Sequence, residues 1–126
     1  MDKNEIGKEG ERVACDYLIQ QGFIIRDKNY RKSWGEIDIV AEKENIVHFV
    51  EVKTHLEKFS IYTFKDNYYE AEERVNATKK KRLARVIQSY LFEKNMEENE
   101  FSVDVIAVYF SQGKDPQIRL IEDIVL

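Results

Sequence analysis

The sequence predicts an α/β fold in which one mixed sheet is flanked by two helices. Two amphipathic segments have helical spacing, about 4–21 and 76–95, and five further segments are typical of strands. The order along the chain is therefore α-β-β-β-α-β-β, and a single sheet covered by helices is the simplest way to bury all the apolar faces. A chain of 126 residues, 43% of them hydrophobic, is sufficient for one packed domain spanning 1–126.

The first half of the chain reads as one helix and three strands. The helix, residues 4–21, carries the apolar stripe Ile6, Val13, Ala14, Tyr17 and Leu18 and ends at Gly22, a residue suited to the left-handed position after a helix. The expected strands are 23–27, 36–42 and 46–54, with a tight turn at Glu44-Asn45 between the last two.

The second half begins with residues 55–74, an aromatic stretch with no readable period. A second helix, 76–95, presents the apolar stripe Leu83, Ala84, Ile87, Tyr90 and Leu91. A strong strand, 101–110, follows an acidic stretch. Gly113, Asp115 and Pro116 then turn the chain into a last strand, 117–121.

Charge and cysteine content restrict the function classes. The net charge is −4, so nucleic-acid binding requires the basic residues to gather on one face, and 79–82 with Arg85 form such a run. The single cysteine, Cys15, excludes an intramolecular disulfide and reads as a buried, inert thiol in a reducing compartment. The N-terminus lacks an apolar signal region, and no apolar run approaches the roughly 20 residues of a membrane span, so a cytoplasmic protein with no membrane partner is expected.

The candidate site lies on the two strands of the predicted hairpin. Strand alternation places Glu51 and Lys53 side by side at the end of a very apolar strand, and it points Glu36 and Asp38 one way and Ile37 and Ile39 the other. If Asp38 and Glu51 share a face, their carboxylates repel unless a cation lies between them. Mg²⁺ fits this pair, and Lys53 then supplies a positive charge beside the metal. The alternative is a solvated surface pair of Glu51 with Lys53.

Two helical features are candidates for the same site. Glu11 shares a helical face with Gly7, Ala14 and Leu18, so it is either a third carboxylate aimed at the metal or a surface glutamate at the core margin. The basic run begins near a helix N-terminus, where the helix dipole does not favour cations. Either the run is a solvated face, or an anion such as a DNA phosphate compensates it.

Several segments together resemble the bacterial YraN family. They are Gly10-Glu11, Gly22-Phe23, Asn29-Tyr30-Arg31, residues 35–41, residues 49–53, residues 79–83, Val103-Asp104-Val105 and residues 118–124. That family is similar in fold to archaeal Holliday junction resolvases, within the PD-(D/E)XK nuclease superfamily. The resemblance therefore implies a restriction-endonuclease-like fold.

The resemblance also implies roles for individual residues. It makes Glu11, Asp38 and Glu51 metal-site acids, Lys53 the catalytic lysine and the carbonyl of Val52 a further metal ligand. Residues implied or suspected to contact nucleic acid are Lys79, Lys80, Arg82 and Arg31, while Glu36 and Asp104 match recurrent acids that fit sheet support as well as chemistry. The chain departs from the family at His55, where an arginine is usual, and in the length of the aromatic stretch.

These observations predict a Mg²⁺- or Mn²⁺-dependent endonuclease that acts on DNA, including branched or junction DNA. A homodimer is expected by analogy with resolvases, which must cut two strands. The first alternative is a nuclease-fold module that binds DNA or a protein without cutting. The second is a structural protein that self-associates through its aromatic segment.

Overall fold

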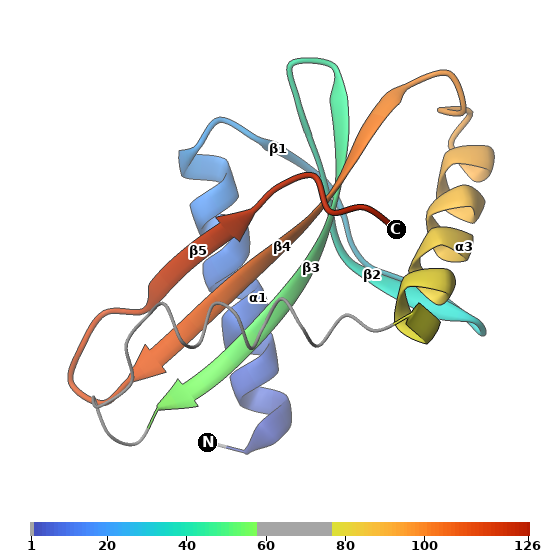
Figure 1. Ribbon diagram of the computed structural model, residues 1–126. Helices are drawn as coiled ribbons and strands as arrows, with labels where there is room; N and C mark the ends of the chain where they lie inside the picture. The colour runs from blue at the N-terminus through green and yellow to red at the C-terminus, as the bar shows by residue number, and fades with distance from the viewer. Residues whose placement is uncertain (1, 58–76) are drawn as a thin grey trace.

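The protein is a five-stranded mixed sheet between two helices in a computed structural model that describes residues 2–57 and 77–126 (Figure 1). The elements are α1 (Lys3–Gln20), β1 (Ile24–Lys32), β2 (Gly35–Lys43), β3 (Ile46–Glu57), α3 (Ala77–Glu93), β4 (Glu100–Ser111) and β5 (Gln117–Ile121). The strands lie in chain order, and β3 pairs parallel with β4 whereas the other neighbours pair antiparallel. Among the described residues, the predicted α/β class and order of elements are confirmed.

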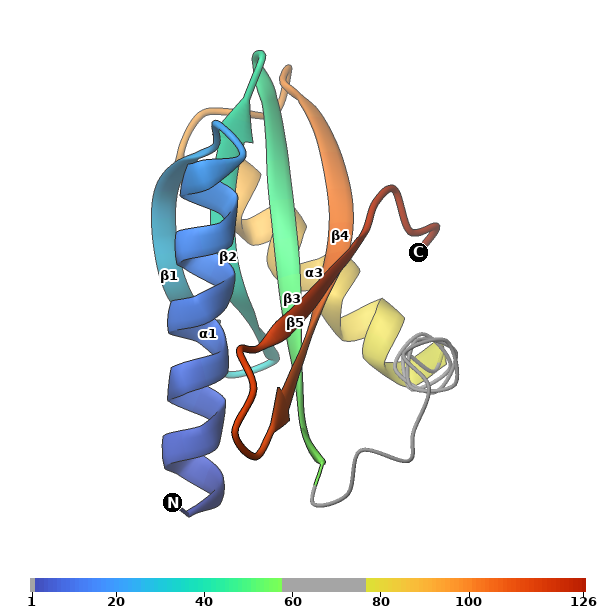
Figure 2. The same cartoon turned by 90° about the vertical axis from the view of Figure 1, so that its left-hand side faces the viewer.

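The two helices cover opposite faces of the sheet (Figure 2). The parallel pair β3–β4 requires a crossover connection, and α3 lies in that connection. The α3 side of the core contains Ile37, Val40, Val47, Phe49, Leu83, Val86, Ile87, Tyr90, Leu91 and Val103. The α1 side contains Ala14, Cys15, Leu18, Phe23, Ile39, Ala41, Val50, Ile106 and Val108. Within the described ranges, no helix is long and apolar enough to cross a membrane.

The helix ends follow the predicted capping chemistry. Gly22 adopts a φ of 94°, and Phe23 N–H donates to the Leu18 carbonyl, so α1 ends as predicted. Asn95 adopts a φ of 55° after α3, and Met96 N–H donates to the Leu91 carbonyl. The predicted stripe of α3 omitted Val86, which is fully buried.

The turn at Glu44-Asn45 is confirmed, but β1 and β3 are longer than predicted. Both turn residues have positive φ, 53° and 67°, as a two-residue hairpin turn of the mirror-image type requires. β1 continues beyond residue 27 to Lys32 because its polar, edge-strand half pairs with β2. β3 continues beyond residue 54 to Glu57, which pairs with Ser111 of β4. Residues 58–76, most of the aromatic stretch, lie outside the described residues.

The alternation predicted for β2 is wrong around Asp38. Ile37 packs in the α3 core and Ile39 in the α1 core, so these two residues do not share a face. The ladder between β2 and β3 ends at the pair Ile39–Val50, and on β1 Asn29 adopts a φ of 52° between residues that pair with Ile37 and Ile39. The strands twist at this point and β2 separates from β3, which forms a fork in the sheet (Figure 1).

Candidate metal and nucleic-acid site

The fork between β2 and β3 holds the predicted site residues of the hairpin. Asp38 and Glu51 are the first residues beyond the last pair of the β2–β3 ladder. Glu51 follows Val47 and Phe49 on the α3 side, as predicted, and its side chain is 15% exposed. β3 can continue past the fork because β4 still pairs with it on the other side.

Two lysines meet at the Glu51 carboxylate. Lys53 Nζ lies 3.3 Å and Lys79 Nζ lies 3.5 Å from Glu51 Oε1. Lys53 comes from the same strand, whereas Lys79 comes from the first turn of α3. Burial and the neighbouring Lys79 lower the pKa of the Lys53 ammonium group. Lys79 therefore lies at the predicted site, although it comes 28 positions after Glu51 in the sequence.

Asp38 occupies the other side of the fork. Its Oδ2 accepts a hydrogen bond of 2.8 Å from the backbone N–H of Val52, the residue between Glu51 and Lys53. Burial raises the pKa of Asp38 to about 7, and the negative charges of Glu51 and Glu11 add to the effect. Asp38 lines a hollow on the α1 side, whereas Glu51 lines one on the α3 side. The two acids thus approach each other across the fork and not on one face of a strand.

Helix α1 brings Glu11 to the same region. A Cβ on the preceding residue, Gly10, would overlap the side chain of Thr54 on β3, so glycine permits the helix to lie against the strand here. Glu11 lines the α1-side hollow together with Asp38. Burial raises the pKa of Glu11, and the charges of Glu36 and Glu51 raise it further. Its buried Oε1 has no hydrogen-bond partner in the described part of the chain.

The remaining predicted contacts divide between two hollows beside α3. The first, of about 220 Å³, is lined by Glu51, Lys79, Glu36 and Arg82 together with apolar side chains. The second, of about 650 Å³, is lined by Arg31, Glu36 and Arg82 with further cations. Arg31 forms an ion pair of 2.8 Å with Glu36. Lys80 lines neither hollow, so the structure does not group it with the other candidate residues.

Comparison with known sequences identifies the family. The model of uncharacterised protein family UPF0102 matches residues 10–108. The chain belongs to family UPF0102. This is the YraN family, so the predicted family membership is confirmed.

UPF0102 relatives match over nearly their whole length. The UPF0102 protein of Clostridium tetani is 37% identical over 120 residues, 94% of this chain and 92% of the relative. The UPF0102 protein of Thermodesulfovibrio yellowstonii is 37% identical over 125 residues, 98% of this chain and 97% of the relative. That of Campylobacter lari is 35% identical over 118 residues, 94% and 91% of the two chains. The matched region includes every candidate site residue.

This UPF0102 chain has a second polar cluster that the sequence analysis did not predict. His48, Asp104 and Glu122 place potential ligand atoms within 4.8 Å of one another. His48 Nδ1 lies 2.6 Å from Asp104 Oδ2, and both side chains are buried. Asp104 Oδ1 accepts further hydrogen bonds from Ser102 Oγ and Asp123 N–H. One polar residue in each of two apolar strands is the signal that could have indicated this pair.

The hydrogen bonds of Asp104 give it a structural role. They join β3, β4 and the segment after β5, where Ile124 N–H also donates to the Val103 carbonyl. Both sheet support and chemistry were predicted as possible roles for Asp104, and these contacts favour support. His55, at the position of the family's usual arginine, stacks on Tyr109 with ring centroids 4.8 Å apart.

Proposed function

We propose that this protein is a Mg²⁺- or Mn²⁺-dependent endonuclease of the PD-(D/E)XK type that cuts DNA. The observation that carries this proposal is the electrostatic interaction of Glu11, Asp38 and Glu51 at the fork, with Lys53 and Lys79 at the Glu51 carboxylate. Among the described residues, the oxygens of these three acids do not all lie within 4.8 Å of one another, so a bound cation would have to draw them closer. A mixed sheet with helices on both faces agrees with the restriction-endonuclease-like fold that the resemblance implies.

The carboxylates fit a hard divalent cation. The raised pKa values of Asp38 and Glu11 mark acids whose charge the surrounding protein groups do not fully compensate. The buried, unpartnered Oε1 of Glu11 is a ligand atom that a cation or its water could use. Asp38, Glu51 and the Val52 carbonyl would hold the metal, with Glu11 beside them. Mg²⁺ typically takes one or two protein carboxylates and keeps several waters.

The lysines then have distinct roles. A bound Mg²⁺ lowers the pKa of a coordinated water and offsets charge on the phosphate. Lys53, whose pKa is lowered by burial and by Lys79, is suited to orient the attacking water or accept its proton. Lys79 reaches the site from α3 and is half-exposed, so it can meet the phosphate. Arg82 lines both hollows beside α3 and is placed to contact a neighbouring phosphate, whereas Arg31 would first have to leave its ion pair with Glu36.

A cleavage assay tests this proposal. Junction, flap, nicked and single-stranded DNA are incubated with Mg²⁺ and, separately, with Mn²⁺. Lys53→Ala is expected to reduce the rate by at least about 100-fold, because it removes a group that acts on the proton of the nucleophile. Lys114→Ala, in the exposed turn between β4 and β5, is the matched control and should cleave like the wild type. Equal trace cleavage by all three proteins on every substrate would contradict the proposal.

One observation favours the alternative, a module that binds without cutting. Glu51 is already paired with two lysines, so part of the charge that a metal would neutralise is neutralised by the protein. Calorimetric titration with Mn²⁺ distinguishes the two functions. A catalytic site should bind Mn²⁺ and lose that binding in Asp38→Asn. A binding module should show DNA affinity with no Mn²⁺ binding in either protein.

A further inference from the structure

The two hollows beside α3 share part of their lining but differ chemically. The first contains Glu51 and Lys79, and the rest of its wall is largely apolar, formed by Leu83, Val103, Val105, Ile124 and Leu126. The second is bounded by the β1–β2 turn and α3, and its cations are Arg31, Lys32, Lys81, Arg82 and Arg85. Gly35, Glu36 and Arg82 line both hollows. An elongated ligand can therefore extend from the candidate metal site into the second hollow, the basic groove.

Three cations of the basic groove are available to an anion. Arg31 is paired with Glu36, and Lys32 is paired with Glu93. Lys81, Arg82 and Arg85 are exposed and form no ion pair with any residue in the described ranges. Arg82 and Arg85 are three positions apart on α3, as are Lys79 and Arg82. On a helix, this spacing places side chains in one row about 5–6 Å apart, so the cations form a track that begins at the candidate metal site.

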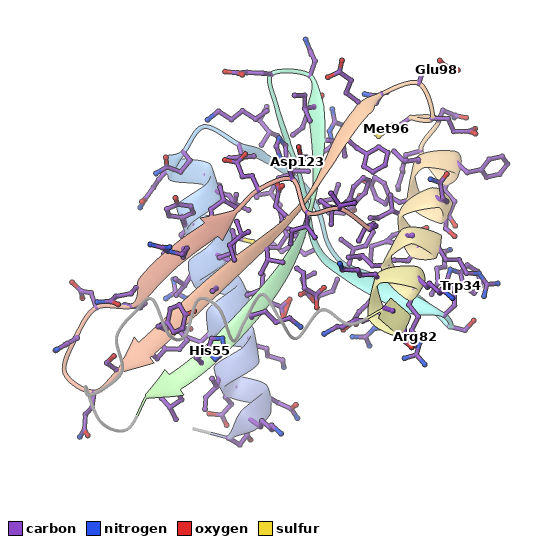
Figure 3. The ribbon with its side chains drawn as sticks, viewed as in Figure 1. Trp34, His55, Arg82, Met96, Glu98 and Asp123 are labelled. Carbon is purple, nitrogen blue, oxygen red and sulfur yellow. The ribbon has the colours of Figure 1, made fainter. Side chains whose placement is uncertain are left out.

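Arg85 lies over the ring of Trp34 in this groove. Its guanidinium carbon lies 4.5 Å from the centroid of the Trp34 ring, and Trp34 itself packs against the α3 side of the core. The labelled Trp34 and Arg82 lie together where the β1–β2 turn meets α3 (Figure 3). Trp34 is thus a positioning residue: its ring supports the Arg85 guanidinium without using the guanidinium donors. A guanidinium supported in this way can stack on a base and still bind a phosphate.

We propose that the substrate enters this site as an unpaired strand. The nucleotide beside the cut places its base against the apolar wall of the first hollow. The following backbone crosses Gly35 and Arg82 and enters the basic groove, where Arg85 stacks on a base or binds a phosphate. This inference rests on the proposed function for the position of the cut, and it assigns the substrate class: DNA with a single-stranded segment.

The apolar wall is the reason for preferring an unpaired strand to duplex DNA. In a duplex the bases stack and pair on the inside, and the backbone that meets a protein is charged and polar. Apolar side chains next to the scissile phosphate would then have no apolar partner. An unpaired nucleotide offers the face of its base, and single-strand sites combine such contacts with a positive groove. The volume of the first hollow, about 220 Å³, suits a small group and not a duplex.

Fluorescence anisotropy in EDTA tests binding apart from cleavage. The probes are a fluorescein-labelled 20-nucleotide single strand, the blunt duplex of the same sequence and an abasic strand of the same length. The full chain should bind the base-bearing single strand about tenfold or more tightly than the duplex and the abasic strand, given the usual contribution of base stacking. Equal or tighter binding of the duplex, or equal binding of the abasic strand, would overturn the inference.

Two pairs of variants locate the contact. Ile124→Trp places a bulky ring in the first hollow, where the base is proposed to lie, and should weaken single-strand binding about tenfold. Val125→Trp changes the adjacent residue, which is 82% exposed, and should not weaken it. Arg85→Lys keeps the charge but loses the planar stack, so it should weaken the single strand and leave the duplex unchanged. Lys114→Ala is the control for general charge. If Ile124→Trp binds like Val125→Trp, or Arg85→Lys like the wild type, the assignment is wrong.

The same assay separates a nucleic-acid groove from a surface for acidic proteins. Labelled polyglutamate should bind weakly, because it lacks bases for the apolar wall. Polyglutamate binding as tight as that of the single strand, and insensitive to Ile124→Trp, would overturn the inference in favour of an acidic protein partner. If the protein binds single strands as described but cuts no DNA, the proposed nuclease activity is wrong and the proposed single-strand groove still holds. A protein that cuts blunt duplex as fast as flap DNA would contradict the groove alone.

Discussion

Asp38 and Asp104 are two aspartates of the same sheet with little solvent exposure, and they differ in how many hydrogen-bond partners their carboxylates have. Asp104 is fully buried and both of its oxygens have partners, His48 on one side and Ser102 and Asp123 on the other. Asp38 accepts one hydrogen bond, from Val52 N–H, and is surrounded by other acids that help to raise its pKa to about 7. The fold thus satisfies one enclosed carboxylate with its own donors and leaves the other largely without them, and under the proposed function a cation would supply the missing compensation at Asp38.

The surroundings of the two residues explain the difference. Asp104 pairs with Val50 of β3 and lies one residue beyond the end of the β4–β5 ladder. The segment after β5 nevertheless returns over it and supplies the Asp123 N–H, while Ser102 and His48 supply side-chain partners. Asp38 lies where β2 leaves β3, so the neighbouring strand no longer offers a regular set of donors. The fork opens the sheet and gathers acids from α1, β2 and β3, which is an arrangement that costs stability in the absence of a cation. The well-satisfied aspartate and the proposed functional aspartate therefore occupy different parts of one sheet.

The largest expected effect on stability is from Asp104→Ala. The change leaves the Asp123 amide, the Ser102 hydroxyl and His48 without their acceptor in a buried region. We expect the free energy of unfolding to fall by about 3 kcal/mol, because unsatisfied buried groups are costly. Urea denaturation followed by circular dichroism measures it, and Asp115→Ala in the exposed β4–β5 turn is the control. Mn²⁺ binding at 25 °C should persist in Asp104→Ala, and its loss there would make the cluster part of the metal site.

Asp38→Asn should have the opposite sign at neutral pH. The pKa of Asp38 is about 7 in the fold against an ordinary 3.8, so the folded protein binds more protons than the unfolded chain between these values. Stability therefore falls as pH rises from 3.8 to about 7, and the full cost remains above 7. Asparagine keeps an acceptor for Val52 N–H and removes the charge. We expect the variant to be more stable than the wild type by roughly 2 kcal/mol at pH 8 in EDTA.

Urea titrations at several pH values measure this effect. The two proteins should converge in stability as pH falls below 3.8, since Asp38 then becomes protonated in both the folded and the unfolded wild type. Saturating Mn²⁺ should reverse the order at pH 8, because the cation stabilises only the protein that binds it. Asp115→Asn, with an exposed carboxylate, should show neither behaviour. A wild type that is more stable than Asp38→Asn at pH 8 in EDTA would mean that Asp38 is as well satisfied as Asp104.

The α/β class and the part of the candidate site on β3 could be predicted from the sequence. Period-two alternation placed Glu51 and Lys53 correctly because β3 is regular and pairs with β4 throughout that region. The same rule failed for Asp38, because the end of the β2–β3 ladder and the positive φ of Asn29 disturb β2. Capping glycine and turn residues have local signals, whereas a fork depends on which strand stops pairing first. That is a tertiary property.

Long-range pairing of polar residues was also beyond the sequence. The contact of Lys79 with Glu51 was approached only through the resemblance and the basic run, and the contact of His48 with Asp104 was not predicted. The aromatic character of Trp34 gave no sign of its contact with Arg85, since the two residues come from the β1–β2 turn and α3. Each of these pairs joins segments whose spacing in the chain carries no information about their distance.

The smallest expected effect is from Gly10→Ala, which tests how α1 delivers Glu11 to the fork. Alanine in a helix is ordinarily more stable than glycine by about 0.5–1 kcal/mol, and Gly7→Ala should show this gain because nothing lies within 4 Å of its Cβ. At Gly10 the added Cβ overlaps the Thr54 side chain, so we expect a loss of about 1–2 kcal/mol. Thr54→Ala in the same chain removes the overlapping atoms and should restore stability.

Mn²⁺ binding by the same variants tests whether Glu11 belongs to the metal site with Asp38. If the close approach of α1 to β3 sets the position of Glu11, Gly10→Ala should weaken Mn²⁺ binding as well as stability. The double variant with Thr54→Ala should recover both, while Gly7→Ala leaves metal binding unchanged. A Gly10→Ala protein that loses stability but binds Mn²⁺ like the wild type would restrict the uncompensated acids of the metal site to Asp38 and Glu51. Glu11 would then belong with Asp104, among the acids that the fold accommodates without a ligand.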